Sequence, residues 1–176
     1  DSDLEVGLSG YTGIHDPYFR DRFWYGNLDF KYKYRPSAYT AVVVQGEYLA
    51  SRRTAHQDAS LLPLIDARGN PEERTISSSG LYVYADVRFL KMYSVGARLD
   101  WTQSPYSKDD QMRGVAVFLG YYPVEETLGL RLQYANTSTE VSGRSPTDDT
   151  AANSRNVNSI ALQILFSLGP HKAHPF

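Results

Sequence analysis

Apolar and polar residues alternate along most of this chain with a period of two. In residues 24–34, every second position from Trp24 onward is apolar or glycine, and the positions between are mostly polar. This alternation is typical of a β-strand with one apolar and one polar face. Seven further segments share it: residues 4–8, 42–48, 81–89, 93–101, 115–121, 128–134 and 160–168. No segment has a convincing helical stripe, so the pattern predicts eight antiparallel strands.

The connections between these strands alternate in length. Those around Pro36, at residues 90–92 and at residues 122–127 are tight, whereas residues 13–22, 54–79, 103–112 and 139–155 form longer polar loops. Transmembrane β-barrels have short turns on the periplasmic side and longer loops outside. The sequence therefore predicts an all-β, antiparallel, up-and-down transmembrane β-barrel in the bacterial outer membrane, with the tight turns in the periplasm. The eight strands are either the whole barrel or half of a larger one.

Aromatic residues lie at both ends of the apolar repeats, as in the two girdles of a membrane barrel. The predicted girdle residues are Trp24, Tyr48, Trp101 and Tyr134 near the loops, and Tyr34, Phe89, Tyr93, Tyr121 and Phe166 near the tight turns. The rise from Tyr93 to Trp101 is about 20 Å for a strand tilted by about 40°. The alternative is a soluble antiparallel sandwich or lipocalin-like barrel, whose apolar face would point inward.

The polar register carries the candidate functional residues. The predicted lumen-lining residues are Glu5, Asp29, Glu47, Asp86 and Asp100, together with Lys31, Lys33, Arg88, Arg98 and Arg131, so the lumen is nearly neutral. In a closed eight-stranded barrel these charges must pair, because an unpaired buried charge costs several kcal/mol. In a wider barrel they stay hydrated and line a channel. Two functions remain open: a porin-like channel for small hydrophilic solutes or ions, and a filled barrel that acts as a structural or binding module.

Three segments carry a resemblance to a known family. They are residues 25–35 (Tyr-Gly-Asn-Leu-Asp-Phe-Lys-Tyr-Lys-Tyr-Arg), residues 45–49 (Gln-Gly-Glu-Tyr-Leu), and the ending with Gly-Pro-His-x-x-His-Pro-Phe at residues 169–176. The chain resembles the C-terminal half of a poorly characterised family of porin-like bacterial outer-membrane β-barrels, some labelled zinc-regulated or TonB-dependent receptors. This resemblance implies a longer protein, in which residues 1–168 supply barrel strands and loops and residues 169–176 form a periplasmic tail.

Composition narrows the other classes of function. The net charge of -2 gives no electrostatic case for binding nucleic acid, and the absence of cysteine excludes a thiolate metal site. His171 and His174 are weak zinc candidates, because two ligands are too few for a site. Without a nucleophile elbow or triad spacing, we expect no enzyme and no cofactor. The expected partners are outer-membrane lipid, the barrel-assembly machinery, and a homo-oligomer or larger membrane assembly.

Overall fold

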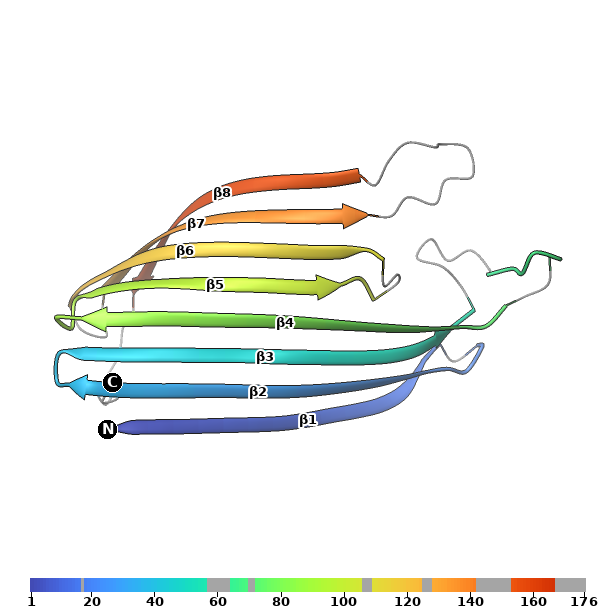
Figure 1. Cartoon of the computed structure of the whole chain (residues 1–176), viewed down its shortest axis with the longest axis horizontal. Coiled ribbons are helices and arrows are strands. Elements are labelled where there is room, and N and C mark those ends of the chain that lie inside the picture. The colour runs from blue at the N-terminus through green and yellow to red at the C-terminus, as the bar shows by residue number, and fades with distance from the viewer. Residues whose placement is uncertain are drawn as a thin grey trace.

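Eight strands form one antiparallel sheet in a computed structural model of the chain (Figure 1). The structure describes residues 1–16, 18–56, 64–69, 72–105, 109–124, 128–141 and 153–166. The strands are β1 (Ser2–Asp16), β2 (Asp21–Ser37), β3 (Thr40–Ala55), β4 (Arg74–Phe89), β5 (Tyr93–Gln103), β6 (Gln111–Val124), β7 (Leu128–Val141) and β8 (Asn153–Phe166). Each strand pairs with its neighbours in the chain, in the order β1 to β8. The prediction of an all-β, antiparallel, up-and-down sheet is confirmed.

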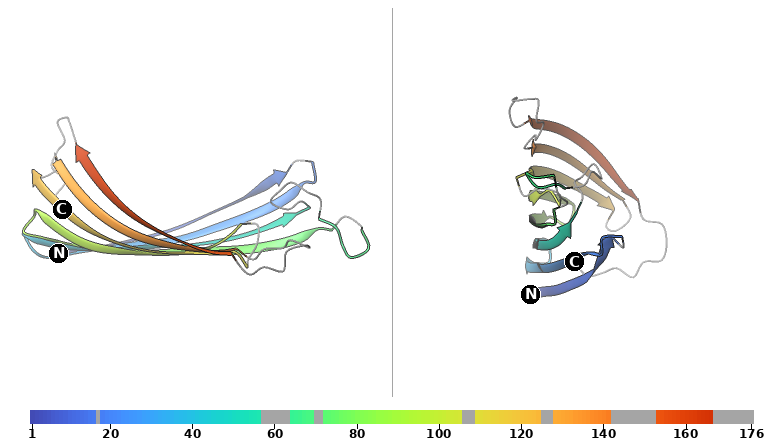
Figure 2. Two further views of the ribbon diagram at one scale, coloured as in Figure 1. Left: turned by 90° about the horizontal axis from the view of Figure 1, so that it is seen from above. Right: turned by 90° about the vertical axis from the view of Figure 1, so that its right-hand side faces the viewer.

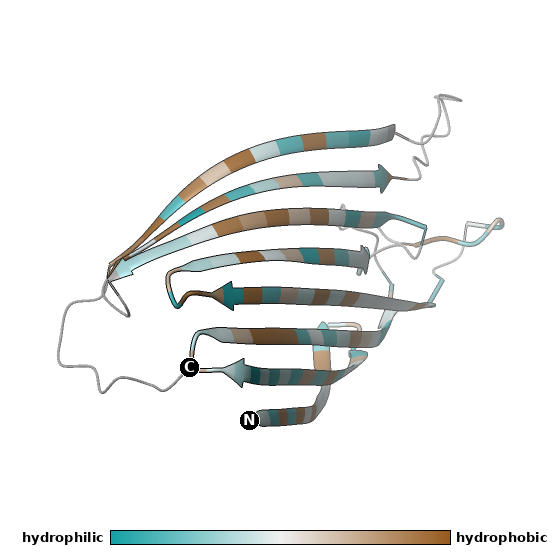
Figure 3. Cartoon of the chain, turned by 60° about the vertical axis from the view of Figure 1, so that its left-hand side comes forward, coloured by the Kyte–Doolittle hydropathy of each residue, from teal (hydrophilic) through white to brown (hydrophobic). Residues whose placement is uncertain are grey.

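The strand registers bring the apolar positions of all eight strands onto one face. One row of directly paired residues crosses the whole sheet: Leu4, Tyr32, Val44, Ala85, Ala97, Val117, Tyr134 and Ile160. Because side chains alternate between the faces of a strand, the polar residues between these positions share the opposite face. Figure 3 shows the resulting alternation of hydrophilic and hydrophobic residues along the strands.

The sheet is strongly curved and open. Figure 2 shows it curling into a trough, with β1 and β8 as its two edges. These edges do not pair with each other, so the structure does not contain the closed barrel. Among the described residues, no helix is long and apolar enough to cross a membrane.

The strands are longer than the apolar repeats predicted. Residues 13–22 were expected to form a loop, but β1 continues to Asp16 and β2 begins at Asp21; likewise β3 reaches Ala55 and β4 begins at Arg74. Backbone pairing continues where the side chains become polar, and polar bonds between strands accompany it. The hydroxyl of Thr12, for example, donates to the carbonyl of Phe23 over 2.7 Å. Side-chain alternation thus located the middle of each strand but not its ends.

The tight turns lie close to their predicted places. Between β4 and β5, Leu90 and Lys91 adopt the left-handed backbone region, with φ of 52° and 60°. Pro36 lies inside the end of β2 rather than in the turn, at a register shift between Tyr34 and Ser37. Proline has no N–H for a regular ladder, so an irregular strand end is where it is tolerated.

Nothing in the described part of the chain covers the apolar face. Buried apolar side chains among the described residues are few: Ala55, Ala116 and Phe118. Leu8 is 84% exposed and Ile160 is 77% exposed, although both belong to the apolar repeat. An apolar surface that extends over eight strands is larger than monomeric soluble proteins usually expose.

Candidate functional site

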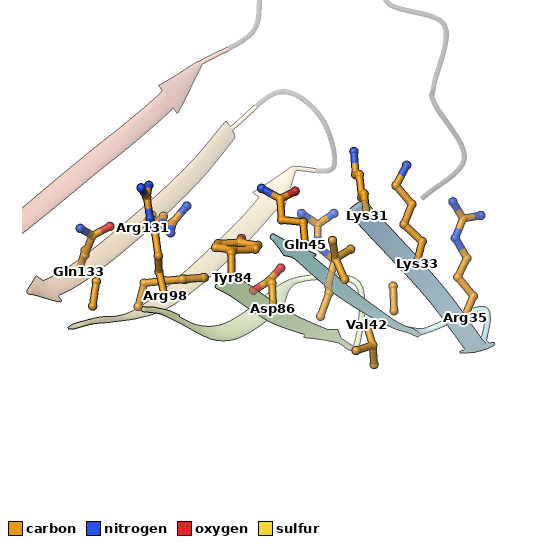
Figure 4. A pocket seen from close by; sticks show the side chains of 15 residues that line it. Lys31, Lys33, Arg35, Val42, Gln45, Tyr84, Asp86, Arg98, Arg131 and Gln133 are labelled. Carbon is orange, nitrogen blue, oxygen red and sulfur yellow. The ribbon is translucent and has the colours of Figure 1, made fainter. Parts of the chain in front are cut away.

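The polar face of the sheet contains a hollow of about 700 Å³, whose walls come from β2 to β7. Figure 4 shows Lys31, Lys33 and Arg35 in a line on β2, on the same side of the sheet as Asp86 and Arg98. The charged residues around it, among those that the structure describes, are Lys31, Lys33, Arg35, Arg88, Arg98, Arg131 and a single carboxylate, Asp86. We call this set the basic hollow. It lies in the concave side of the trough, so the apolar face is the convex side.

Adjacent rows of the sheet explain why these charges meet. One row joins Lys31, Gln45, Tyr84 and Arg98, and the next joins Lys33, Val43, Asp86 and Gly96. A third row pairs Arg88 with Ser94, Ser94 with Gly120, and Gly120 with Arg131. Residues distant in sequence therefore lie close together on one face of the sheet.

Glycine makes room for the aromatic floor of the hollow. Tyr84 and Phe118 stack with their ring centroids 5.3 Å apart and their planes 12° apart. A Cβ on Gly96 would overlap both the Phe118 ring and the carbonyl oxygen of Ala85. Gly96 therefore allows this ring to lie flat over the β5 backbone.

Three arginines of the basic hollow lie over aromatic rings. The guanidinium carbon is 3.6 Å from the Phe118 ring centre for Arg131, 4.4 Å from that of Tyr122 for Arg88, and 4.8 Å from that of Tyr82 for Arg98. Such a ring attracts and orients the cation without neutralising its charge. The arginines are thus held in place while remaining positively charged.

Hydrogen bonding within the hollow is incomplete. Arg98 donates from Nε and Nη2 to Oδ1 of Asp100, at 2.8 and 2.6 Å. In contrast, Oδ1 of Asp86 and Nε of Arg131 are buried without a hydrogen-bond partner. The ammonium groups of Lys31 and Lys33 form no hydrogen bond or ion pair with another residue of the described ranges.

Acidic residues gather in the row next to the hollow, toward the loops. Asp29 pairs directly with Glu47, and Tyr82 separates Glu47 from Asp100. Like charges placed opposite each other are unfavourable. The fifth predicted acid, Glu5, faces Lys31 from β1. The ten predicted residues share one face, as expected, but their charges are separated into a basic and an acidic zone rather than mixed.

Sequence reasoning missed one cation of the basic hollow. Arg35 continues the series of Lys31 and Lys33 by one further step of two. The set of lumen residues predicted from the sequence ends before Arg35 because Pro36 indicates a turn there, whereas β2 continues to Ser37. Extending the alternation by one step identifies it.

The predicted girdle residues lie on the convex face. Phe89, Tyr93 and Tyr121 stack side by side at the turn end, with centroid separations of 5.8 and 5.4 Å. At the loop end, Tyr48 and Trp101 share a row on either side of Leu81. The other predicted members are Trp24, Tyr34, Tyr134 and Phe166, which are all exposed on this face.

From β2 to β8, the apolar band moves along the strands toward the tight turns. Its midpoint on β2 is residue 29, and the row through Asp29 meets β5 at Asp100 and β8 at Val157. The midpoints on β5 and β8, residues 97 and 164, are displaced from that row by three and seven residues toward the tight turns. Between β2 and β8 the band thus shifts by about one residue per strand.

This shift corresponds to a definite tilt. One residue advances about 3.3 Å along a strand while neighbouring strands are about 4.8 Å apart, so a band with this shift runs at about 35° to the sheet rows. Strands of transmembrane barrels are tilted by about 35–45°.

Comparisons with known proteins found no family model, no curated protein and no solved structure that matches this chain. The resemblance to porin-like outer-membrane proteins therefore stays a prediction. So does the weak metal assignment, because His171, His174 and the rest of the tail at residues 169–176 lie outside the described residues. Within the described ranges, no group of three or more His, Asp or Glu side chains is arranged to hold a metal ion.

Proposed function

We propose that this sheet is part of the wall of an outer-membrane β-barrel, and that its concave face lines a porin-like channel for small hydrophilic solutes or ions. The observation that carries the proposal is the apolar band on the convex face, which shifts by about one residue per strand toward the tight turns from β2 to β8. When the strands tilt as in a membrane barrel, a band of this kind becomes a belt that runs parallel to the membrane plane. Lipid would cover that belt, with the aromatic girdles at its borders.

The sign of the curvature argues against the soluble alternative. A lipocalin-like barrel has its apolar residues on the inside, where they form a core or a ligand cavity. Here the apolar residues lie on the outside of the curve, and the charged residues lie inside it. Closure along this curvature would place the charged residues in a lumen and the apolar residues against lipid.

Closure requires partners for both edges. Unpaired backbone groups are too costly in the hydrocarbon region, so neither β1 nor β8 can remain an edge there. We propose that further strands pair with these edges and make a barrel of more than eight strands. A barrel of that width leaves room for water around Lys31 and Lys33, which have no partner in the described ranges.

A filled barrel is the alternative, and the ion pair between Arg98 and Asp100 is the observation that favours it. The two readings give opposite expectations for Arg98→Gln. In a channel, Arg98 is hydrated, as its 50% exposed side chain suggests, so removing its charge shifts ion selectivity toward cations at little cost in stability. In a filled barrel, the same change leaves Asp100 buried without its partner and costs about 3–5 kcal/mol.

The test uses purified full-length protein in planar bilayers, together with the heat resistance of its folded band on a gel. We expect conductance in the parent protein, and in Arg98→Gln a shifted selectivity with nearly unchanged heat resistance. Arg68→Gln is the matched control, because Arg68 is an exposed cation outside the hollow. A parent protein without conductance, combined with a sharp loss of heat resistance in Arg98→Gln, would favour the filled module.

The membrane orientation has a separate test, helped by the absence of cysteine in the chain. Single cysteines in the apolar register should react with a lipid-soluble probe, and those in the polar register with a water-soluble one. The lipid-facing set is Leu28, Val83, Leu99, Leu130 and Leu162; the lumen set is Lys31, Asp86, Arg98, Arg131 and Gln163. Equal labelling of both sets would rule out the proposed orientation.

A further inference from the structure

We propose that the basic hollow is a binding site for anionic oxygens, of the kind carried by phosphate or carboxylate groups on small solutes. The inference rests on the proposed channel for its physiological role, because the hollow then lies on the path of the solute. Among the described lining residues, six cations and one carboxylate surround a space of about 700 Å³, which is ample for a small anion.

The local charge, rather than the total charge of the face, determines what the hollow attracts. Of the acids outside the hollow that balance the lumen as a whole, Asp29, Glu47 and Asp100 form a row of their own beside the hollow, and Glu5 lies opposite Lys31 on β1 without an ion pair to it in the described ranges. Of these, Asp100 engages Arg98 through a single oxygen. Lys31 and Lys33 keep their charges without any partner in the described ranges. The hollow therefore has a net positive potential, which concentrates anions.

The aromatic floor prepares Arg131 for an anion. The guanidinium carbon of Arg131 lies 3.6 Å from the centre of the Phe118 ring. A guanidinium that stacks on a ring by its face still has N–H groups along its edges, and these recognise phosphate or carboxylate oxygens. The buried Nε of Arg131, which lacks a hydrogen-bond partner, is a donor of this kind.

The two lysines are suited to the test because neither has a hydrogen-bond or ion-pair partner to lose among the residues that the structure describes. Inorganic phosphate is titrated into detergent-solubilised full-length protein and followed by calorimetry. Two charges about 8 Å from the anion in a hydrated site make Lys31→Gln/Lys33→Gln bind phosphate about fivefold more weakly than the parent. The control Arg68→Gln/Lys91→Gln removes two cations outside the hollow and should bind like the parent. Heat resistance of the folded band verifies that every variant is folded.

A second measurement separates this inference from the channel proposal. In planar bilayers, the parent should prefer chloride to potassium, and phosphate should reduce the chloride current less in the double lysine variant. Phosphate binding without any conductance would support the hollow and refute the channel. Conductance without phosphate binding, or equal phosphate affinity in the parent and the double lysine variant, would overturn the inference and leave the channel standing.

Discussion

Two carboxylates, Asp21 and Asp86, mark regions of the sheet that are organised in opposite ways. Asp21 begins β2 at the loop end and is 3% exposed. It accepts hydrogen bonds from the Thr54 hydroxyl at 3.4 Å, the His56 backbone N–H at 3.1 Å and His56 Nδ1 at 2.6 Å. Asp86 lies within β4 in the basic hollow, and its Oδ1 is buried without a hydrogen-bond partner.

The polar groups around Asp21 bind to one another and so connect the ends of three strands. Phe19 stacks on His56 with a centroid separation of 5.1 Å, and His15 of β1 contacts the Thr54 carbonyl from Nε2 at 2.9 Å. We call Asp21, Thr54 and His56, with His15 and Phe19, the rim cluster. In the hollow, the Ser94 hydroxyl forms a hydrogen bond with the Asp86 carboxylate, and the positive charges of Arg88 and Arg131 attract it. Oδ1 of Asp86 nevertheless has no hydrogen-bond partner.

The contrast separates a structural role from a binding role. Buried polar groups that are fully hydrogen-bonded stabilise one arrangement, and removing a member is costly because its partners lose their bonds. Buried polar groups that lack partners stabilise little, but they remain available to a ligand. The rim cluster belongs to the first kind, and two groups of the basic hollow, Oδ1 of Asp86 and Nε of Arg131, belong to the second.

The largest effect on stability should follow from Asp21→Ala. The substitution leaves the His56 backbone N–H and imidazole without their acceptor and breaks the link between β2 and β3, at a cost of about 3 kcal/mol. The measurement is the urea midpoint or the heat resistance of the folded full-length protein. Ion selectivity should not change, because Asp21 is outside the hollow. A cost for Asp21→Ala no greater than that of a substitution at Asp86 would contradict the distinction between the two regions.

Much of this organisation follows from the sequence, but only at the level of single strands. A period of two determines which residues share a face of their own strand, so Lys31 and Lys33, or Arg88 and Asp86, were placed together correctly. Which residues face each other across strands depends on register. The pairing of Asp29 with Glu47, which creates the acidic row, is therefore invisible in the alternation itself.

Long-range contacts and closure were likewise beyond the pattern. Asp21 and His56 are 35 residues apart in sequence, and neither belongs to an apolar repeat. The alternation is also the same in an open sheet, a sandwich and a barrel, because it reflects only whether each face of a strand meets apolar or polar surroundings. The curvature and the drift of the apolar band add information on closure because they depend on all eight strands together.

The smaller effect on stability, and the sharper test of the comparison, is expected from Asp86→Asn. Asparagine preserves the size of the side chain. Removing a buried charge whose Oδ1 lacks a hydrogen bond offsets the lost attraction to Arg88 and Arg131, so the stability should change by no more than about 1 kcal/mol. The same substitution removes the single carboxylate among the described lining residues, so the preference for chloride over potassium should increase.

Reversal potentials in a potassium chloride gradient measure this preference, and heat resistance measures stability in the same samples. Asp100→Asn is the matched control, because it removes a carboxylate from the acidic row and with it the negative charge that pairs with Arg98. A loss of stability from Asp86→Asn as large as that from Asp21→Ala, with unchanged selectivity, would mean that Asp86 is a structural residue like Asp21 and that the two regions do not differ in role.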